Sequence, residues 1–190
     1  MDYEKAASGL PFFMSPVPVT PAKILYFCAM PAYISELKDA VLEAFQNLTM
    51  IPEEVAEKRP AEGKWSPKEI IGHLIDSASV NHQRFIRAEF SRELIFDRYA
   101  QDDWVRGQNY QAANWHELLI LWRTFNLHLA HLMENMPDDV RTQPRSVHNL
   151  HEIAFHTVPE DLPTSLDYFM GDYVLHLKHH LAQIEKLVNS

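Results

Sequence analysis

Cysteine is nearly absent from this sequence, which has one, Cys28, in 190 residues. A single thiol cannot form an intramolecular disulfide, so the sequence excludes a disulfide-stapled scaffold and favours a reducing compartment. Long apolar runs are missing too: the longest candidate, 24–34, is broken by Pro31 and is shorter than the roughly 20 residues that span a bilayer. We therefore expect a soluble, cytoplasmic protein with no membrane partner.

Positive charge is also scarce. Lys and Arg total 17 against 26 Asp and Glu, which gives a formal net charge of −9. Such a surface would repel a phosphate backbone, so nucleic acid is not an expected partner. The 46% of apolar residues is an ordinary share for one globular domain, whereas 12 prolines against five glycines, and 11 histidines, are unusual figures.

Prolines divide the chain into an irregular and a regular part. Residues 1–29 hold four prolines and no sustained hydrophobic period, which predicts a poorly ordered N-terminal tail. The regular pattern starts at Met30, so we expect one domain over 30–190 and a functional chain that begins near Met30. The intact mass of protein made from its natural message tests this expectation, and a product that contains Met1 would contradict it.

Four segments show the three-and-four spacing of apolar residues that indicates amphipathic helices: 31–48, 67–90, 115–136 and 164–188. Ser66 with Glu69 predicts an N-terminal capping box for the second segment. Asn114 and Thr164 are the expected caps of the third and the fourth. No strand is predicted, and the connections 91–113 and 138–163 are too long to be tight turns. The fold class is therefore an all-α four-helix bundle with long crossover connections.

Histidines in the fourth segment have the spacing of a chelating pair. His176 and His180 lie about 40° apart on one helical face, so both imidazoles can reach one cation, whereas His179 should point outward. His73 in the second segment is a candidate third ligand, because antiparallel helices with flush ends would place it about 10 Å, and the pair about 15 Å, from the same end. Around the axis of its helix, His73 is rotated by much more than about 90° from the centre of the apolar face. It is expected to line a polar cleft at the edge of the core, or else to be a partly exposed histidine.

Two common metal motifs are absent from the sequence. It contains no His-Glu-x-x-His, which excludes the usual zinc-protease geometry, and no Glu-x-x-His, which disfavours a ferritin-like di-iron site.

The segments 65–77 and 176–184 together resemble the DinB-like superfamily, and 102–110 and 115–136 look like the same branch. The resemblance covers about 31–188 and leaves 1–29 without a counterpart. It implies a four-helix bundle with one crossover that makes the second and fourth helices antiparallel. It also implies a divalent metal held by His73, His176 and His180, and commonly a homodimer.

Three neutral imidazoles would leave a divalent ion open positions, which can activate water or bind a thiolate at neutral pH. The superfamily includes thiol transferases and isomerases that use a low-molecular-weight thiol, as well as proteins regarded as metal-dependent hydrolases. We expect a divalent-metal-dependent enzyme that performs thiol transfer or hydrolysis on a small molecule. The alternative is a non-catalytic metal-binding bundle with a stress-related or interaction role. Zinc or nickel suits imidazole best, and manganese or iron also occupies open histidine sites.

Three polar residues lie within about a turn of a proposed ligand and are candidates to orient its ring: Asp76, Asp172 and Gln183. Ordinary helix-surface polarity would explain them equally well.

Two residues are candidate substrate contacts. Arg84 shares a side of its helix with His73 and could bind a carboxylate, with a salt bridge as the alternative. Trp104 could wall the cleft, although an aromatic residue buried under a long crossover would look the same in sequence.

Overall fold

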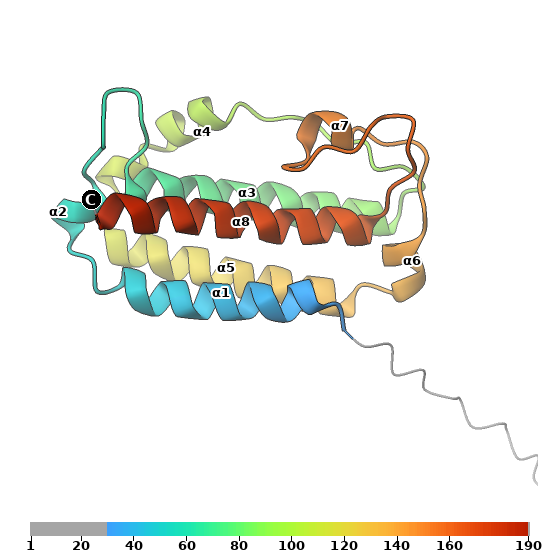
Figure 1. Cartoon of the computed structure of the whole chain (residues 1–190), viewed down its shortest axis with the longest axis horizontal. Helices are drawn as coiled ribbons and strands as arrows, with labels where there is room; N and C mark the ends of the chain where they lie inside the picture. Colours follow the sequence, from blue (N-terminus) through green and yellow to red (C-terminus); the bar gives the residue numbers. More distant parts are fainter. Residues whose placement is uncertain (1–29, 190) are drawn as a thin grey trace, which may run out of the picture.

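The computed structural model describes residues 30–189, so the expected tail 1–29 lies outside the described residues. Within 30–189 the chain is helical and contains no strand. Four long helices form a bundle (Figure 1): α1 (Ala32–Leu48), α3 (Pro67–Glu89), α5 (Trp115–Asn135) and α8 (Leu166–Val188). The prediction of an all-α four-helix bundle is confirmed.

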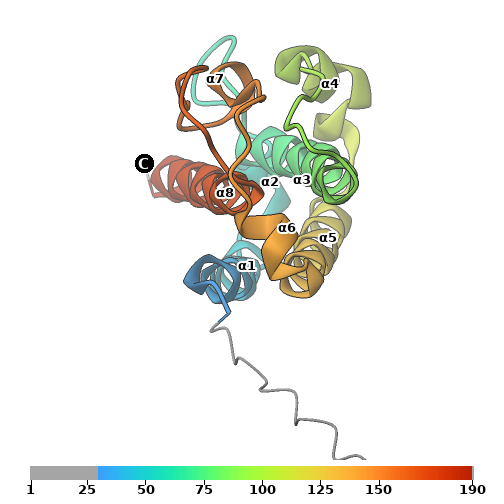
Figure 2. The same cartoon turned by 90° about the vertical axis from the view of Figure 1, so that its right-hand side faces the viewer.

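The end-on view shows how the four helices neighbour one another (Figure 2). α1 packs against α5 and α8 and lies diagonally across the bundle from α3, which also contacts α5 and α8. α3 runs antiparallel to α8 and in the same direction as α5. The chain between α3 and α5 must therefore return along the bundle, and this crossover carries α4 (Gln101–Gln108) and the short 3-10 helix η1 (Tyr110–Ala112).

Further short helices lie in the other connections. α2 (Glu53–Ala56) precedes α3, while α6 (Asp138–Thr142) and α7 (Leu150–Ile153) lie between α5 and α8. α7 and the chain around it lie beside α8 at the same side of the bundle as α4 (Figure 2).

The predicted capping residues of α3 and α5 are confirmed. The Ser66 hydroxyl accepts a hydrogen bond from the Glu69 amide at 3.2 Å, and the Glu69 carboxylate accepts one from the Ser66 amide at 2.9 Å. At α5, the Asn114 side chain accepts a hydrogen bond from the Glu117 amide at 3.0 Å. These caps satisfy amides that the first helical turn leaves without partners, and so fix where α3 and α5 begin.

The predicted cap of the last helix is wrong by one residue. The Ser165 hydroxyl, not that of Thr164, accepts the hydrogen bond from the Tyr168 amide, at 3.2 Å. The backbone of Thr164 instead pairs with Arg145 in an isolated antiparallel bridge, with N···O distances of 2.7 and 3.0 Å. Thr164 is thereby held outside the helix.

The N-terminal half of α3 is buried on every side, because residues 67–78 are all buried. α5 and α8 pack on two sides of α3, and α2, α4 and η1 contact it as well. Polar side chains on this part of α3 consequently lie in the interior and need partners there.

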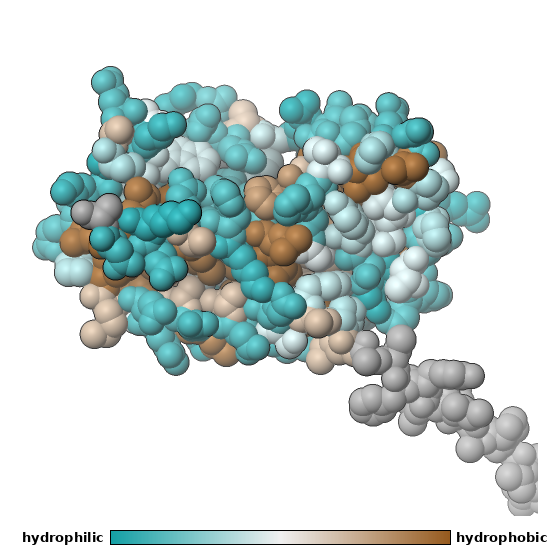
Figure 3. Space-filling view, in the orientation of Figure 1, coloured by the Kyte–Doolittle hydropathy of each residue, from teal (hydrophilic) through white to brown (hydrophobic). Residues whose placement is uncertain are grey.

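Hydrophilic side chains cover most of the face shown in Figure 3, with hydrophobic patches over α8 and over the connection that carries α7. No helix within residues 30–189 is long and apolar enough to cross a membrane.

Candidate metal centre

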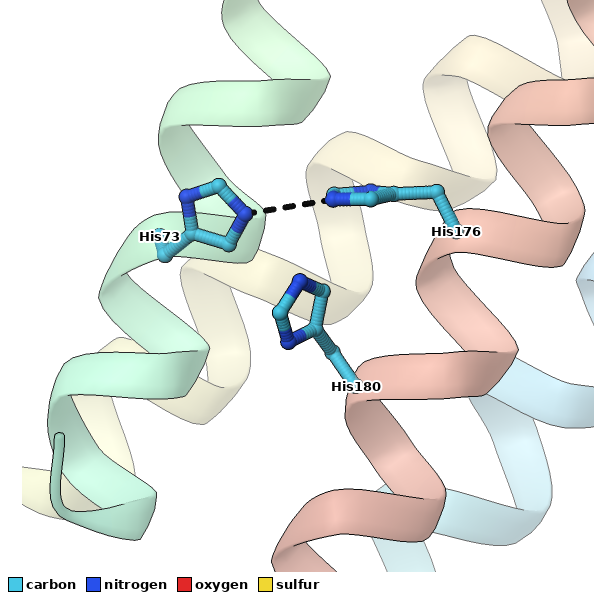
Figure 4. Close-up of side chains that lie close together, drawn as sticks. All are labelled: His73, His176 and His180. Atoms are coloured by element: carbon cyan, nitrogen blue, oxygen red, sulfur yellow. Dashed lines mark hydrogen bonds between the residues drawn. The ribbon is translucent and has the colours of Figure 1, made fainter. Parts of the chain in front are cut away.

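Three histidines from two helices meet beside the core. His73 projects from α3, and His176 and His180 project from successive turns of α8, so that the three rings point toward one another (Figure 4). Their ligating nitrogen atoms all lie within 4.8 Å of one another. The Nε2 atoms of His73 and His176 are 3.2 Å apart. Among residues 30–189, these three make up the one group of histidine, cysteine or acidic side chains this closely gathered.

The distance between His73 and His176 fits two ligands of one divalent ion. Imidazole nitrogens lie about 2.0–2.1 Å from zinc, so two nitrogens on one ion at angles of about 90–110° would be about 2.8–3.4 Å apart. The 3.2 Å between His73 and His176 falls in this range. The three ring centroids are 4.6–5.2 Å apart, and no acidic side chain within residues 30–189 joins the group. An all-imidazole set suits zinc, nickel, copper or iron better than magnesium or calcium.

Burial keeps the three rings in the neutral form that binds metals. Loss of solvent, together with a smaller effect of the nearby His176 and His180, lowers the pKa of His73 to about 3. Burial likewise lowers the pKa of His176 to about 3, with His180 and His179 adding to the effect. Burial also lowers the pKa of His180. Metal binding at neutral pH would therefore displace few protons from these imidazoles.

The position of His73 on its helix predicted that it lines a cleft at the edge of the core or is partly exposed, and both expectations are wrong. Its side chain has no exposed surface, and the indole of Trp65 covers it at a ring distance of 4.9 Å. The prediction failed because it assumed a helix with one solvent-facing side, whereas the crossover covers the outer side of α3. His179 points outward as predicted and is exposed.

Gln183 contacts a histidine of the cluster. Its side-chain oxygen lies 3.0 Å from Nδ1 of His180, so it can accept a hydrogen bond from that nitrogen and leave Nε2 for a metal. This is the arrangement in which an outer partner fixes the tautomer and the orientation of a ligand ring.

Asp76 makes its hydrogen bonds away from the histidines. One carboxylate oxygen accepts a hydrogen bond from the Tyr110 hydroxyl at 2.7 Å and another from the Gln108 amide. Its other oxygen and Nδ1 of His73 are both buried and have no hydrogen-bond partner in the described part of the chain. Burial raises the pKa of Asp76, and the bonds from Tyr110 and Gln108 oppose that rise. Asp76 therefore ties the crossover to α3.

Asp172 holds a loop over the cluster. Its carboxylate accepts hydrogen bonds from the backbone amides of Phe155 and His156, both at 2.7 Å, and its contact with a ring nitrogen is to His156 at 3.2 Å. The Phe155 ring packs against His176 and His179, with centroid distances of 5.5 and 5.2 Å. Asp172 thus positions the residue that covers His176.

The two predicted substrate contacts have other surroundings. Arg84 is buried and donates hydrogen bonds to the Asp97 carbonyl at 2.6 Å and to the Asn81 side chain at 3.4 Å. Trp104 is 40% exposed and packs on Tyr99 with a ring distance of 4.9 Å. Neither residue lines the pocket beside the histidines.

A pocket of about 390 Å³ opens beside the cluster, a size suited to a small molecule. His176 and His180 line it, and the outline of the molecule dips between α4 and α7, whose chain segments contribute to its walls (Figure 3). The other lining residues are Ser77, Tyr99, Gln101, Glu152, Ile153, Ala154, Phe155, Asp172, Tyr173 and His179. His73 forms the buried back of the cluster, so a ligand would approach from the side of α8.

Several of these wall residues were not predicted from the sequence, among them Tyr99, Glu152 and Phe155. They lie in connections without a helical period, so no spacing linked them to the histidines. The one available signal was the aromatic and polar composition of connections too long to be simple turns.

Comparison with known proteins supports the assignment of the fold. The sequence matches the DinB superfamily over residues 33–184. A search of curated proteins finds no match. Among solved structures, the chain is similar to YfiT from Bacillus subtilis, with a TM-score of 0.66 and 18% identity over 83% of this chain and 84% of that one. YfiT is described as a probable metal-dependent hydrolase with an unusual four-helix bundle topology. The match to the superfamily spans most of the sequence, and the chain therefore belongs to the DinB superfamily.

Proposed function

We propose that the protein is a divalent-metal-dependent enzyme that hydrolyses a small molecule, with His73, His176 and His180 as the metal ligands. The observation that carries this proposal is the convergence of three neutral imidazoles beside an open pocket. The description of YfiT as a probable metal-dependent hydrolase supports the same reaction class. A divalent ion held there would supply Lewis-acid activation of a nucleophile at neutral pH.

The residues around the cluster have separable tasks in this proposal. Gln183 orients His180, and Asp172 fixes the loop that brings Phe155 onto His176. Trp65 and Phe155 exclude water from the His73 and His176 rings on the sides that they cover. The pocket side of His176 and His180 stays open to a substrate.

Thiol transfer is the second candidate reaction, and one observation favours it. The two aspartates closest to the cluster in sequence are occupied, Asp76 by Tyr110 and Gln108, and Asp172 by backbone amides. Neither of these two aspartates is thus free to take a proton from water. A thiol needs less assistance because it ionises close to neutral pH and is the stronger nucleophile.

Turnover assays on one set of proteins test the proposal. Protein reconstituted with zinc, nickel or manganese is assayed against activated esters and amides, and against electrophiles with a low-molecular-weight thiol. His180→Ala should lose turnover while it keeps its helical circular dichroism, and His116→Ala, at an exposed position on α5, should retain turnover. Equal turnover in wild type and His180→Ala would overturn the proposal.

A further inference from the structure

We infer that the substrate presents a positively charged group, which the carboxylate of Glu152 receives at the wall of the pocket. This inference rests on the proposed function, since it concerns the molecule that the same pocket binds.

Two carboxylates and no lysine or arginine line this pocket among the described residues. Asp172 is 4% exposed, and both of its oxygens accept hydrogen bonds from backbone amides, so its charge is buried in the wall. The side chain of Glu152 is 42% exposed. Its one ion-pair contact among the described residues is with His151, at 3.9 Å. Glu152 is thus the acidic group left to pair with a ligand.

The aromatic side chains of the pocket favour the same sign of charge. Tyr99 and Phe155 line the wall together with Glu152, and the faces of such rings attract cations. Ser77 and Gln101, which also line the pocket, are uncharged. A positive group would therefore find one carboxylate and two aromatic rings in the same pocket.

Apart from the metal ion itself, a negatively charged group would find no lysine or arginine among the described side chains of the wall. Arg84, the expected carboxylate ligand, is buried and bonded to the Asp97 carbonyl. Arg87 and Arg98 line the adjoining cavity, which shares Glu152, and are not among the residues that line this one. The formal net charge of −9 also disfavours the approach of anions.

The test uses three small thiols of different charge as probes of full-length protein loaded with cobalt(II). Cysteamine is cationic, 2-mercaptoethanol is neutral and 3-mercaptopropionate is anionic. Coordination of each thiol is followed by the cobalt–thiolate charge-transfer band at pH 8, where imidazoles of ordinary pKa are neutral. Each thiol is titrated into wild type, Glu152→Gln and Glu152→Lys. Glu117→Gln serves as the matched control, because α5 contributes no residue to the pocket.

Comparison of variants with the same thiol cancels the intrinsic differences among the probes. Glu152→Gln should lower the affinity for cysteamine by about three- to ten-fold and raise the affinity for 3-mercaptopropionate by a similar factor. The affinity for 2-mercaptoethanol should be unchanged. Glu152→Lys should enlarge both changes, and Glu117→Gln should match wild type. Glu152 is exposed, so these variants should keep the fold, which circular dichroism checks.

Two failures can be told apart. Cobalt bands that respond equally to the three thiols in wild type and in Glu152→Gln would overturn the charge preference and leave the metal site standing. Wild-type protein that gives no cobalt bands would overturn the proposed function, and the charge preference with it.

Discussion

Single side chains determine how the histidine cluster responds to pH. The pKa of His73 and of His176 is about 3, below the ordinary histidine value of 6.5, so the unfolded chain takes up these protons first as the pH falls. The stability that depends on the neutral His73 and His176 rings is fully present above about pH 6.5 and is lost as the pH falls toward 3. We expect the free energy of unfolding of metal-free protein to fall by up to about 1.4 kcal/mol per pH unit for each of the two imidazoles.

Urea denaturation at pH 7.5, 6.0, 5.0 and 4.5 measures this loss. His176→Ala should reduce the slope of the unfolding free energy against pH, and His116→Ala should leave that slope unchanged. An identical slope in wild type and His176→Ala would show that the buried rings do not cause the pH dependence of stability.

A second effect at the scale of one residue concerns Gln183. Gln183→Leu removes the acceptor for Nδ1 of His180, and we expect metal affinity to fall by about ten-fold or more. Competition with a chromophoric chelator measures the affinity. Gln183→Glu retains an acceptor oxygen and should bind metal at least as tightly as wild type. If the leucine variant binds as tightly as wild type, the contact does not orient the ring.

Gly72 gives a third residue-scale prediction. A Cβ atom at this position would overlap the ring of Tyr110, whose hydroxyl bonds Asp76. Gly72→Ala should therefore destabilise the protein by about 1–3 kcal/mol, which lowers the thermal midpoint by about 2–4 °C per kcal/mol. Gly107 is the matched control, because a Cβ there meets nothing within 4 Å, and its replacement by alanine in α4 should be neutral or stabilising. A neutral Gly72→Ala variant would mean that Tyr110 does not pack tightly on α3.

At the scale of elements, the loop after α7 depends on an anchor in α8. Asp172→Ala removes the acceptor of the Phe155 and His156 amides, so we expect faster hydrogen exchange at both amides and a loss of about 1–3 kcal/mol of stability. Asp161→Ala, at an exposed position in the same connection, is the control and should leave the exchange unchanged. Unchanged protection in Asp172→Ala would mean that other contacts hold the loop.

The long helices were predictable because each repeats an apolar period over many turns. The expected segment 67–90 differs from α3 by one residue, and the caps at Ser66 and Asn114 follow from side-chain chemistry that is local in sequence. The short helices α2, α6 and α7 were not predicted, since four or five residues cannot display a helical period. Ser165 and Thr164 both offer a capping hydroxyl, and the bridge of Thr164 to Arg145 decides between them.

The site was predictable only in part, because spacing within a helix is visible in the sequence and contacts between distant segments are not. The spacing of His176 and His180 is local, and helix length places His73 at their level, so the three-histidine cluster could be expected. The burial of His73 and the walls contributed by Tyr99 and Phe155 depend on where the crossovers lie, which is a non-local property. The hydrogen bonds of Asp76 and Asp172 likewise join segments whose contact no spacing reveals.

At the scale of the whole molecule, the bundle holds imidazoles from two antiparallel helices in one place. A folded, prearranged site should gain stability from a metal that the unfolded chain binds poorly. We expect zinc or nickel at about 100 times its dissociation constant to stabilise the protein by about 2.7 kcal/mol. Thermal unfolding with increasing metal measures this gain, with His116→Ala as the control that should behave as wild type. A midpoint that does not respond to metal would argue against a preformed site.

The central claim is that His73, His176 and His180 hold a divalent metal, and elemental analysis of purified protein tests it most directly. Wild type and a variant with all three histidines changed to alanine are compared, with His116→Ala, at an exposed position on α5, as the control. We predict about one divalent metal per chain in wild type and in His116→Ala, and none in the triple variant. Wild type that remains metal-free after reconstitution with zinc, nickel and manganese, or a triple variant that retains its metal, would contradict the claim.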